Sequence, residues 1–182
     1  MFRKITNISG AYCLKNFTAL DNRGKFFKIF RHDQFPEEIN SLHFRESFFT
    51  ESKKNVLRGM HFQLPPYDLD KTATVISGKV LDVILDMRRS SPTFKQIFHT
   101  YLGENCDFST IFVPKGCAHG FLALEDNSRM LYCTTCEFHP EYDSGIHYDS
   151  FYFDWPINMS DIIISEKDKN LPAWNPEESP FL

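Results

Sequence analysis

The chain has 182 residues and a formal net charge of −4 at pH 7. This length suits one domain spanning residues 1–182 with a sizeable core, and the slightly acidic balance lacks the basic surface that binds nucleic acid. The apolar runs are too short to span a bilayer and the first residues lack a signal-peptide core, so we expect a cytoplasmic protein without a membrane partner.

Short apolar runs separated by turn residues fill most of the chain and predict a series of β-strands. The expected strands are residues 11–20, 25–31, 41–51, 56–63, 71–76, 79–86, 94–102, 110–113, 121–125 and 129–138. A turn at 21–24 follows the first strand, and Ser77 and Gly78 predict a hairpin between the fifth and sixth. A short helical turn is expected at 35–39, and the chain beyond Pro140 is rich in loops. About ten short strands predict an all-β fold, an antiparallel β-sandwich or barrel of jelly-roll type with short helical segments.

The predicted strand at residues 56–63 carries the first candidate chemistry. Alternation places Met60 and Phe62 on one face and His61 on the other. Arg58 would then lie on the face away from His61, unless a bulge at Gly59 brings the two together. A histidine transfers protons near neutral pH and an arginine binds anions. By itself, a histidine on a half-buried strand more often has a structural role than a catalytic one.

Five cysteines form an odd, irregularly spaced set that favours reduced thiols over disulfides. Cys133 and Cys136 make a CxxC pair, but on a strand their side chains would point to opposite faces. Because no second pair accompanies them, the sequence does not predict a zinc or redox site here.

Eight stretches together match one known family in order along nearly the whole chain. They are residues 21–26, 56–63, 75–83, 86–94, 113–121, 131–132, 154–156 and 165–168. On these motifs the chain resembles the dTDP-4-dehydrorhamnose 3,5-epimerase family, which are sugar-nucleotide epimerases on a cupin jelly roll. The resemblance implies that the chain inverts C3, C5 or both in a nucleotide-linked 4-keto-6-deoxy sugar, without a cofactor.

The resemblance also implies four catalytic residues. The hydrogens on the carbons flanking a 4-keto group are acidic, so a base can remove one to give an enolate and an acid can return one on the other face. His61 matches the family base, and Asp168 matches the carboxylate that pairs with it. Lys71 matches the cation beside O4, where the enolate charge develops. Tyr132 matches the acid on the opposite face.

The substrate-binding positions include matches to the family and departures from it. Arg23 and Arg58 match arginines that meet the diphosphate, with His119 nearby, and Gln63 belongs to the same expected substrate site. Where thymidine-specific members carry a glutamate and a Gln-x-Asn, this chain has Lys28, Glu46 and Phe48, and Phe138 replaces a tyrosine near the base.

These departures lead us to expect a GDP-linked sugar in preference to a dTDP-linked one. A carboxylate such as Glu46 can accept hydrogen bonds from both N1–H and the exocyclic amine of guanine, and Lys28 can reach O6. Relatives of this kind act on GDP-linked 4-keto-6-deoxy-heptoses in capsule assembly. The alternative is dTDP-4-dehydrorhamnose 3,5-epimerase proper.

Three other functions are compatible with a cupin. A metal-dependent cupin normally has two histidines one residue apart, but Gln63 stands two residues after His61 and His119 alone cannot hold an ion, so we expect no metal. A 3,4-ketoisomerase and a non-catalytic sugar-nucleotide-binding cupin are the remaining alternatives. The resemblance further implies a homodimer in which an N-terminal strand joins the partner's sheet, so that Arg23 or Lys28 completes the partner's site.

Overall fold

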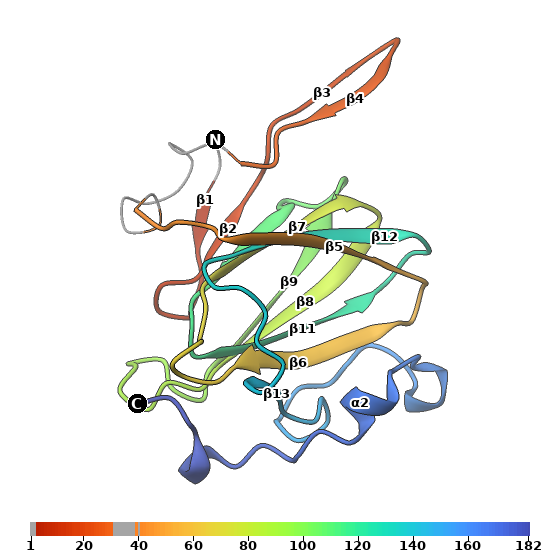
Figure 1. Ribbon diagram of the computed structural model, residues 1–182. Helices are drawn as coiled ribbons and strands as arrows, with labels where there is room; N and C mark the ends of the chain where they lie inside the picture. Colours follow the sequence, from red (N-terminus) through yellow and green to blue (C-terminus); the bar gives the residue numbers. More distant parts are fainter. Residues whose placement is uncertain (1–2, 31–38, 40) are drawn as a thin grey trace.

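The computed structural model describes residues 3–30, 39 and 41–182, in which two antiparallel β-sheets pack face to face (Figure 1). The first sheet has the strand order β1 (Arg3–Ile5), β2 (Tyr12–Leu14), β10 (Thr110–Val113), β7 (Lys71–Ser77), β12 (Ser128–Thr134), β5 (Glu46–Ser52). The second has the order β13 (Asp143–Gly145), β6 (Leu57–Gln63), β11 (Cys117–Ala123), β8 (Lys79–Asp86), β9 (Ile97–Gly103). The predicted cupin jelly roll is confirmed.

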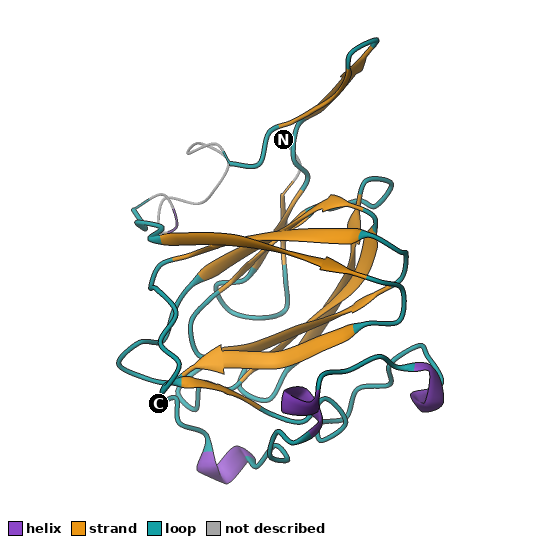
Figure 2. Cartoon of the chain, turned by 45° about the vertical axis from the view of Figure 1, so that its right-hand side comes forward, coloured by secondary structure: helices purple, strands orange, loops and turns teal. Residues whose placement is uncertain are grey.

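The C-terminal segment covers the outer face of the second sheet. It contains the helix α2 (Glu166–Lys169) and 3-10 helices at Met159–Asp161 and Pro176–Glu178, and the helices lie outside the sandwich in both ribbon views (Figures 1 and 2). No helix among the described residues is long and apolar enough to cross a membrane.

The central strand β8 shows why the second sheet is apolar on both faces. Val80 and Ile84 point into the core between the sheets, whereas Leu81 and Val83 pack with the C-terminal segment on the outer face. A strand that is covered on both sides reads as a continuous apolar run. Asp82 interrupts this run on the inner face and is fully buried, so it requires a polar partner inside the sandwich.

Two sequence predictions about strands are wrong. Residues 71–76 and 79–86 do not form a hairpin, because β7 pairs with β10 and β12 while β8 pairs with β9 and β11. Gly78, which has φ of +78°, turns the chain from one sheet to the other. Residues 11–20 are likewise split into β2 and β3 (Thr18–Asp21) by Asn16, whose side-chain amide donates to the carbonyls of Lys28 and Ile29.

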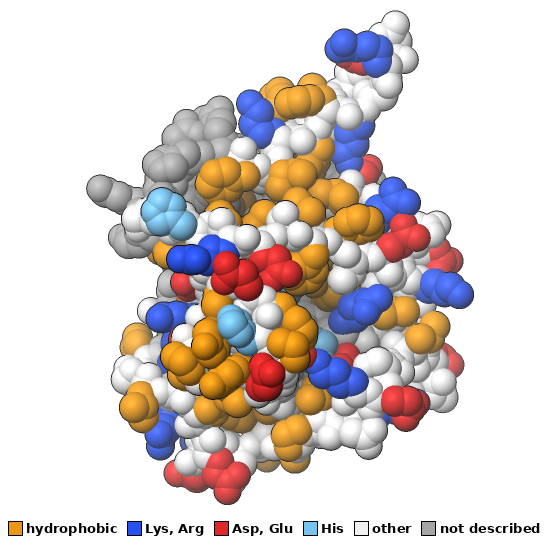
Figure 3. Space-filling view, viewed as in Figure 1, with side chains coloured by type: hydrophobic (Ala, Val, Ile, Leu, Met, Phe, Trp, Pro, Cys, Tyr) orange, Lys and Arg blue, Asp and Glu red, His pale blue; other side chains and the backbone are white. Residues whose placement is uncertain are grey.

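Among the described residues, strands β3 and β4 (Gly24–Phe27) pair only with each other, and they project from the sandwich as a separate hairpin (Figure 1). Their residues are mostly exposed, and hydrophobic side chains gather near the root of the hairpin (Figure 3). The exposed fractions are 55% for Phe17, 77% for Leu20 and 57% for Phe26. The helical turn expected at 35–39 lies, apart from Ile39, outside the described residues.

Candidate active site

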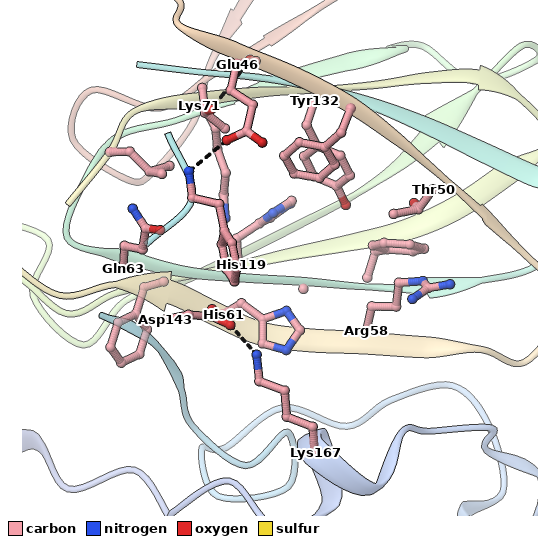
Figure 4. A pocket seen from close by; sticks show the side chains of 17 residues that line it. Glu46, Thr50, Arg58, His61, Gln63, Lys71, His119, Tyr132, Asp143 and Lys167 are labelled. Atoms are coloured by element: carbon pink, nitrogen blue, oxygen red, sulfur yellow. Dashed lines mark hydrogen bonds and ion pairs between the residues drawn. The ribbon is translucent and has the colours of Figure 1, made fainter. Parts of the chain in front are cut away.

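A pocket of about 410 Å³ opens between the two sheets. Alternating residues of β5, β7 and β12 line one wall, and residues of β6, β11 and β13 line the other (Figure 4). The labelled polar and aromatic lining residues are Glu46, Thr50, Arg58, His61, Gln63, Lys71, His119, Tyr132, Asp143 and Lys167. The pocket size and the convergence of polar groups in an apolar wall are typical of a small-molecule site.

A β-bulge in β6 brings Arg58 and His61 to the same pocket. His119 pairs with His61 and Phe121 pairs with Arg58, so two steps along β11 correspond to three along β6. The extra residue reverses the alternation, which places Arg58 and His61 on one face while Met60 stays in the outer core. Gly59 is required at the bulge because it has φ of +131° and a Cβ there would lie 2.5 Å from the Gly120 Cα. The sequence left open whether strict alternation or a bulge at Gly59 applies here, and the structure shows the bulge.

His61 forms a hydrogen-bonded pair with Asp168 of α2. The His61 Nε2 and Asp168 Oδ1 atoms are 2.8 Å apart, and the side chain of Asp168 is buried whereas that of His61 reaches the pocket. An ionised carboxylate accepts only, so Nε2 carries the proton and Nδ1 is the basic nitrogen.

Local structure of α2 and the bulge holds Asp168 ionised. Its backbone N–H donates to Ser165 Oγ at 3.1 Å, which caps the helix, and Asp168 Oδ2 accepts from the Gly59 N–H at 3.3 Å. Burial alone would raise the pKa of Asp168, but the hydrogen bond and charge of His61 together with the Gly59 and Ser165 contacts lower it below its usual value.

Tyr132 faces the pocket from β12, on the sheet opposite to His61 (Figure 4). Its ring stacks on Phe48, with centroids 4.9 Å apart and planes 19° apart. Burial and then the nearby Asp82 raise the pKa of Tyr132 above its ordinary value, against the opposing effects of Arg58 and Thr50. The phenol therefore remains protonated in the physiological range and can act as a proton donor.

The partly buried Lys71 and the buried His119 line the pocket, and the fully buried Asp82 carboxylate pairs with His119. The Nε2 atom of His119 lies 3.0 and 2.9 Å from the two carboxylate oxygens of Asp82, which is the polar partner that Asp82 requires. Burial lowers the pKa of His119 against the opposing charge of Asp82. Burial also lowers the pKa of Lys71 to about 8, although Asp82 raises it.

We expect the rate of any reaction that needs the Lys71 cation to fall as the pH rises through about 8. The ammonium group loses its proton in that range, so a charge that it stabilises in the protonated form is no longer stabilised at higher pH. Substitution of Lys71 by Met should lower kcat by about 10²- to 10³-fold at pH 7. It should also abolish the alkaline limb of the kcat profile. A profile that keeps the same alkaline limb in Lys71→Met would assign the limb to another group.

Two predicted binding residues lie in the pocket wall but are occupied by contacts within the chain. The side-chain amide of Gln63 donates to the Tyr67 carbonyl at 2.7 Å and its Oε1 accepts from the His139 N–H at 2.7 Å. Glu46 Oε2 accepts from the Phe138 N–H at 2.8 Å. Gln63 thus supports the wall, and Glu46 has one carboxylate oxygen committed to the backbone.

The remaining predicted residues divide between this pocket and the projecting hairpin. Arg58, Phe48, His119 and Phe138 line the pocket. Arg23 and Lys28 do not, and the Arg23 guanidinium instead pairs with Asp21 at 2.6 Å on the exposed hairpin tip.

Sequence reasoning missed Asp143 and Lys167, whose side chains form an ion pair at the pocket mouth beside His61 (Figure 4). Lys167 directly precedes Asp168 in the matched motif at 165–168, so its position was a signal. Asp143 lies in β13, a strand of three residues inside a segment predicted as loop, and carried no such signal.

Comparison with known proteins identifies relatives over almost the whole chain. The sequence model described as dTDP-4-dehydrorhamnose 3,5-epimerase matches residues 5–176. The chain is 38% identical to the dTDP-4-dehydrorhamnose 3,5-epimerase of Methanothermobacter thermautotrophicus, over 94% of this chain and 91% of that protein. It is 37% identical to the enzyme of the same name from Escherichia coli, over 91% of this chain and 90% of that protein.

A solved structure gives the same relationship. The chain is similar to dTDP-6-deoxy-D-glucose-3,5-epimerase from Legionella pneumophila in complex with dTDP-4-keto-L-rhamnose, with a TM-score of 0.81 and 30% identity. The similarity covers 96% of this chain and 100% of the other. These relatives are named for dTDP-linked sugars, so they favour the alternative in the sequence analysis over the expected GDP-linked heptose and its role in capsule assembly.

Proposed function

The chain belongs to the dTDP-4-dehydrorhamnose 3,5-epimerase family and is a sugar-nucleotide epimerase, and we propose that its substrate is a dTDP-linked 4-keto-6-deoxy sugar inverted at C3, C5 or both. The observation that carries this proposal is the placement of His61 and Tyr132 on opposite walls of one pocket, with Lys71 also lining it. Inversion at carbon requires a base and an acid on opposite faces of the sugar ring, and this pocket offers that arrangement.

The reaction proceeds by proton removal and return. His61 Nδ1 takes the proton from the carbon beside the keto group, and Asp168 stabilises the imidazolium that forms. The electron pair moves to O4, where the partly buried Lys71 cation stabilises the enolate. Tyr132 returns a proton to the same carbon from the opposite face. Proton removal and return conserve the oxidation state of the sugar, so the balance needs no external oxidant or reductant.

The outer part of the pocket accounts for a preference for thymine. Thymine presents one N–H between two carbonyl groups. Glu46 Oε2 already accepts from the Phe138 N–H, whereas no hydrogen bond within the described residues engages Oε1, which is free to accept the single N–H of thymine. The two adjacent donors of guanine would have to share Oε2 with this backbone N–H. Phe48 and Phe138 are 44% and 57% exposed and supply apolar contact for a planar base.

Epimerisation of dTDP- and GDP-linked 4-keto-6-deoxy hexoses, followed by nuclear magnetic resonance, tests the choice of nucleotide. We expect kcat/KM for the dTDP-linked sugar to exceed that for the GDP-linked sugar by about tenfold or more, equivalent to about 1.4 kcal/mol. Equal or faster turnover of the GDP-linked sugar would overturn the proposed base preference. Turnover of neither sugar would contradict the substrate assignment as a whole.

A homodimer is the assembly that we propose for this enzyme. The β3–β4 hairpin has no partner strand outside itself among the described residues, and the described pairings of β5, which borders the pocket, are with β12 alone. A partner's hairpin added along the open edge of β5 would cover the exposed phenylalanines and bring Arg23 and Lys28 to the site. Sedimentation equilibrium should give twice the chain mass, and a single-chain mass at micromolar concentration would contradict this assembly.

A further inference from the structure

A second cluster of potential ligands lies in the segment that follows β12. The thiol of Cys136, the carboxylate of Glu137 and the imidazole of His139 place one ligand atom each within 4.8 Å of one another. We propose that these three side chains bind a Zn²⁺ ion, with water in the fourth position. The site is separate from the catalytic pair of His61 and Asp168.

Hydrogen bonds fix the backbone that carries these ligands. Thr134 Oγ1 donates to the Cys136 carbonyl at 2.9 Å, and the Gln63 side chain spans the segment by donating to the Glu137 carbonyl at 3.2 Å and accepting from the His139 N–H at 2.7 Å. The His139 ring is stacked on Tyr67, with centroids 3.7 Å apart. Three ligands on a restrained backbone lose less conformational entropy on binding than ligands on a free loop.

The donor set selects the metal. A thiolate and an imidazole favour zinc over the hard ions Mg²⁺ and Ca²⁺, which prefer oxygen ligands. Zn–S distances near 2.3 Å and Zn–N or Zn–O distances near 2.0–2.2 Å require ligand atoms about 3.5 Å apart in a tetrahedron. The three ligand atoms lie within 4.8 Å of one another, so side-chain rotation has to bring them closer when an ion binds.

The existing ion pair of Glu137 does not prevent an ion from binding. Glu137 lies 3.6 Å from Arg45, but both side chains are more than half exposed. Such a surface pair contributes little to stability, so the carboxylate can leave Arg45 and bind the metal. Cys136 and His139 are partly exposed, which gives an ion a path from solvent. Cys133, the other half of the CxxC pair, does not belong to the cluster, because it lies within β12 while Cys136 lies beyond its end.

Cobalt and zinc titrations of the full chain without an affinity tag test the site. We expect Co²⁺ to produce a thiolate-to-metal charge-transfer band at one ion per chain, and Zn²⁺ to displace it with a Kd below about 1 µM. Cys136→Ser should abolish the band, and His139→Ala should weaken Zn²⁺ binding by about a hundredfold. Cys133→Ser is the matched control, since it removes a cysteine three residues away and should leave the band and the affinity unchanged.

Three results would overturn the proposal. They are absence of a charge-transfer band in the wild-type chain, a band that depends on Cys133 instead of Cys136, and Zn²⁺ affinity that is equal in the wild type and in His139→Ala. Circular dichroism establishes that each variant is folded, and His139→Ala still tests the site if Cys136→Ser does not fold. The titrations measure metal binding and not catalysis. A chain that binds no metal could therefore still be an epimerase, and a chain without epimerase activity could still bind metal at this site.

Discussion

Substitution of His61 by Asn is expected to abolish incorporation of solvent deuterium at C3 and C5 of the sugar while nucleotide affinity stays unchanged. The Nδ1 atom of His61 is available as the proton acceptor on this wall, because Nε2 donates to the buried Asp168 at 2.8 Å. His119 lies on the same wall next to the buried Asp82, but only 3% of it is exposed, whereas the His61 side chain is 33% exposed. Asparagine keeps a polar side chain of similar reach, but its amide cannot accept a proton near neutral pH. Loss of a general base costs about 10²–10⁴-fold in rate.

Asp168→Asn provides the comparison for this variant. It retains the base but removes the charge that fixes the tautomer and stabilises the imidazolium, so the rate of deuterium incorporation should fall by less than in His61→Asn. Mass spectrometry of the recovered sugar nucleotide measures both rates. Exchange at the wild-type rate in His61→Asn would remove His61 from the role of base.

Substitution of Tyr132 by Phe is expected to separate proton removal from inversion. The base remains in place on the opposite wall, so deuterium should still enter from the His61 side with retention of configuration. Net inversion should fall by about a hundredfold or more, since the phenol that returns the proton on the other face is absent. The aromatic ring that stacks on Phe48 is preserved, so the change tests the hydroxyl and not the packing.

Tyr142→Phe is the matched control for Tyr132→Phe. Tyr142 packs against Tyr67, with centroids 4.6 Å apart, and does not line the described pocket. Its substitution should leave both exchange and inversion at wild-type rates. Inversion that is unchanged in Tyr132→Phe and reduced in Tyr142→Phe would transfer the role of acid to Tyr142.

The two-sheet architecture was accessible from the sequence because most strands are short apolar runs with clear turn residues between them. Pairing was less accessible, since it depends on contacts far apart in the chain. Ser77 and Gly78 have the composition of a hairpin turn, yet they carry the chain from one sheet to the other. The strand β7 pairs with β10 and β12, and the strand β8 pairs with β9 and β11. Local turn chemistry cannot distinguish these outcomes.

The site was predicted in part from residues and in part from the family resemblance. Gly59 gave a local signal, since a glycine inside a strand indicates a bulge, and the bulge is what places Arg58 beside His61. Asp168 had no local signal connecting it to His61, because the two are 107 residues apart and meet only when α2 packs on β6. The sequence led us to expect that both carboxylate oxygens of Glu46 accept hydrogen bonds from guanine. It could not show that Oε2 already accepts a hydrogen bond from the Phe138 N–H, because this contact forms only in the folded chain.

Incubation of the wild-type enzyme with a dTDP-linked 4-keto-6-deoxy hexose in D₂O tests whether this pocket exchanges carbon-bound protons beside a C4 keto group. We expect deuterium at C3, C5 or both in the recovered sugar, inversion at the labelled carbon, and a carbonyl that stays at C4. A carbonyl found at C3 would indicate a ketoisomerase. A bound sugar nucleotide that gains no deuterium would indicate a binding protein, and either result would exclude epimerisation by this pocket.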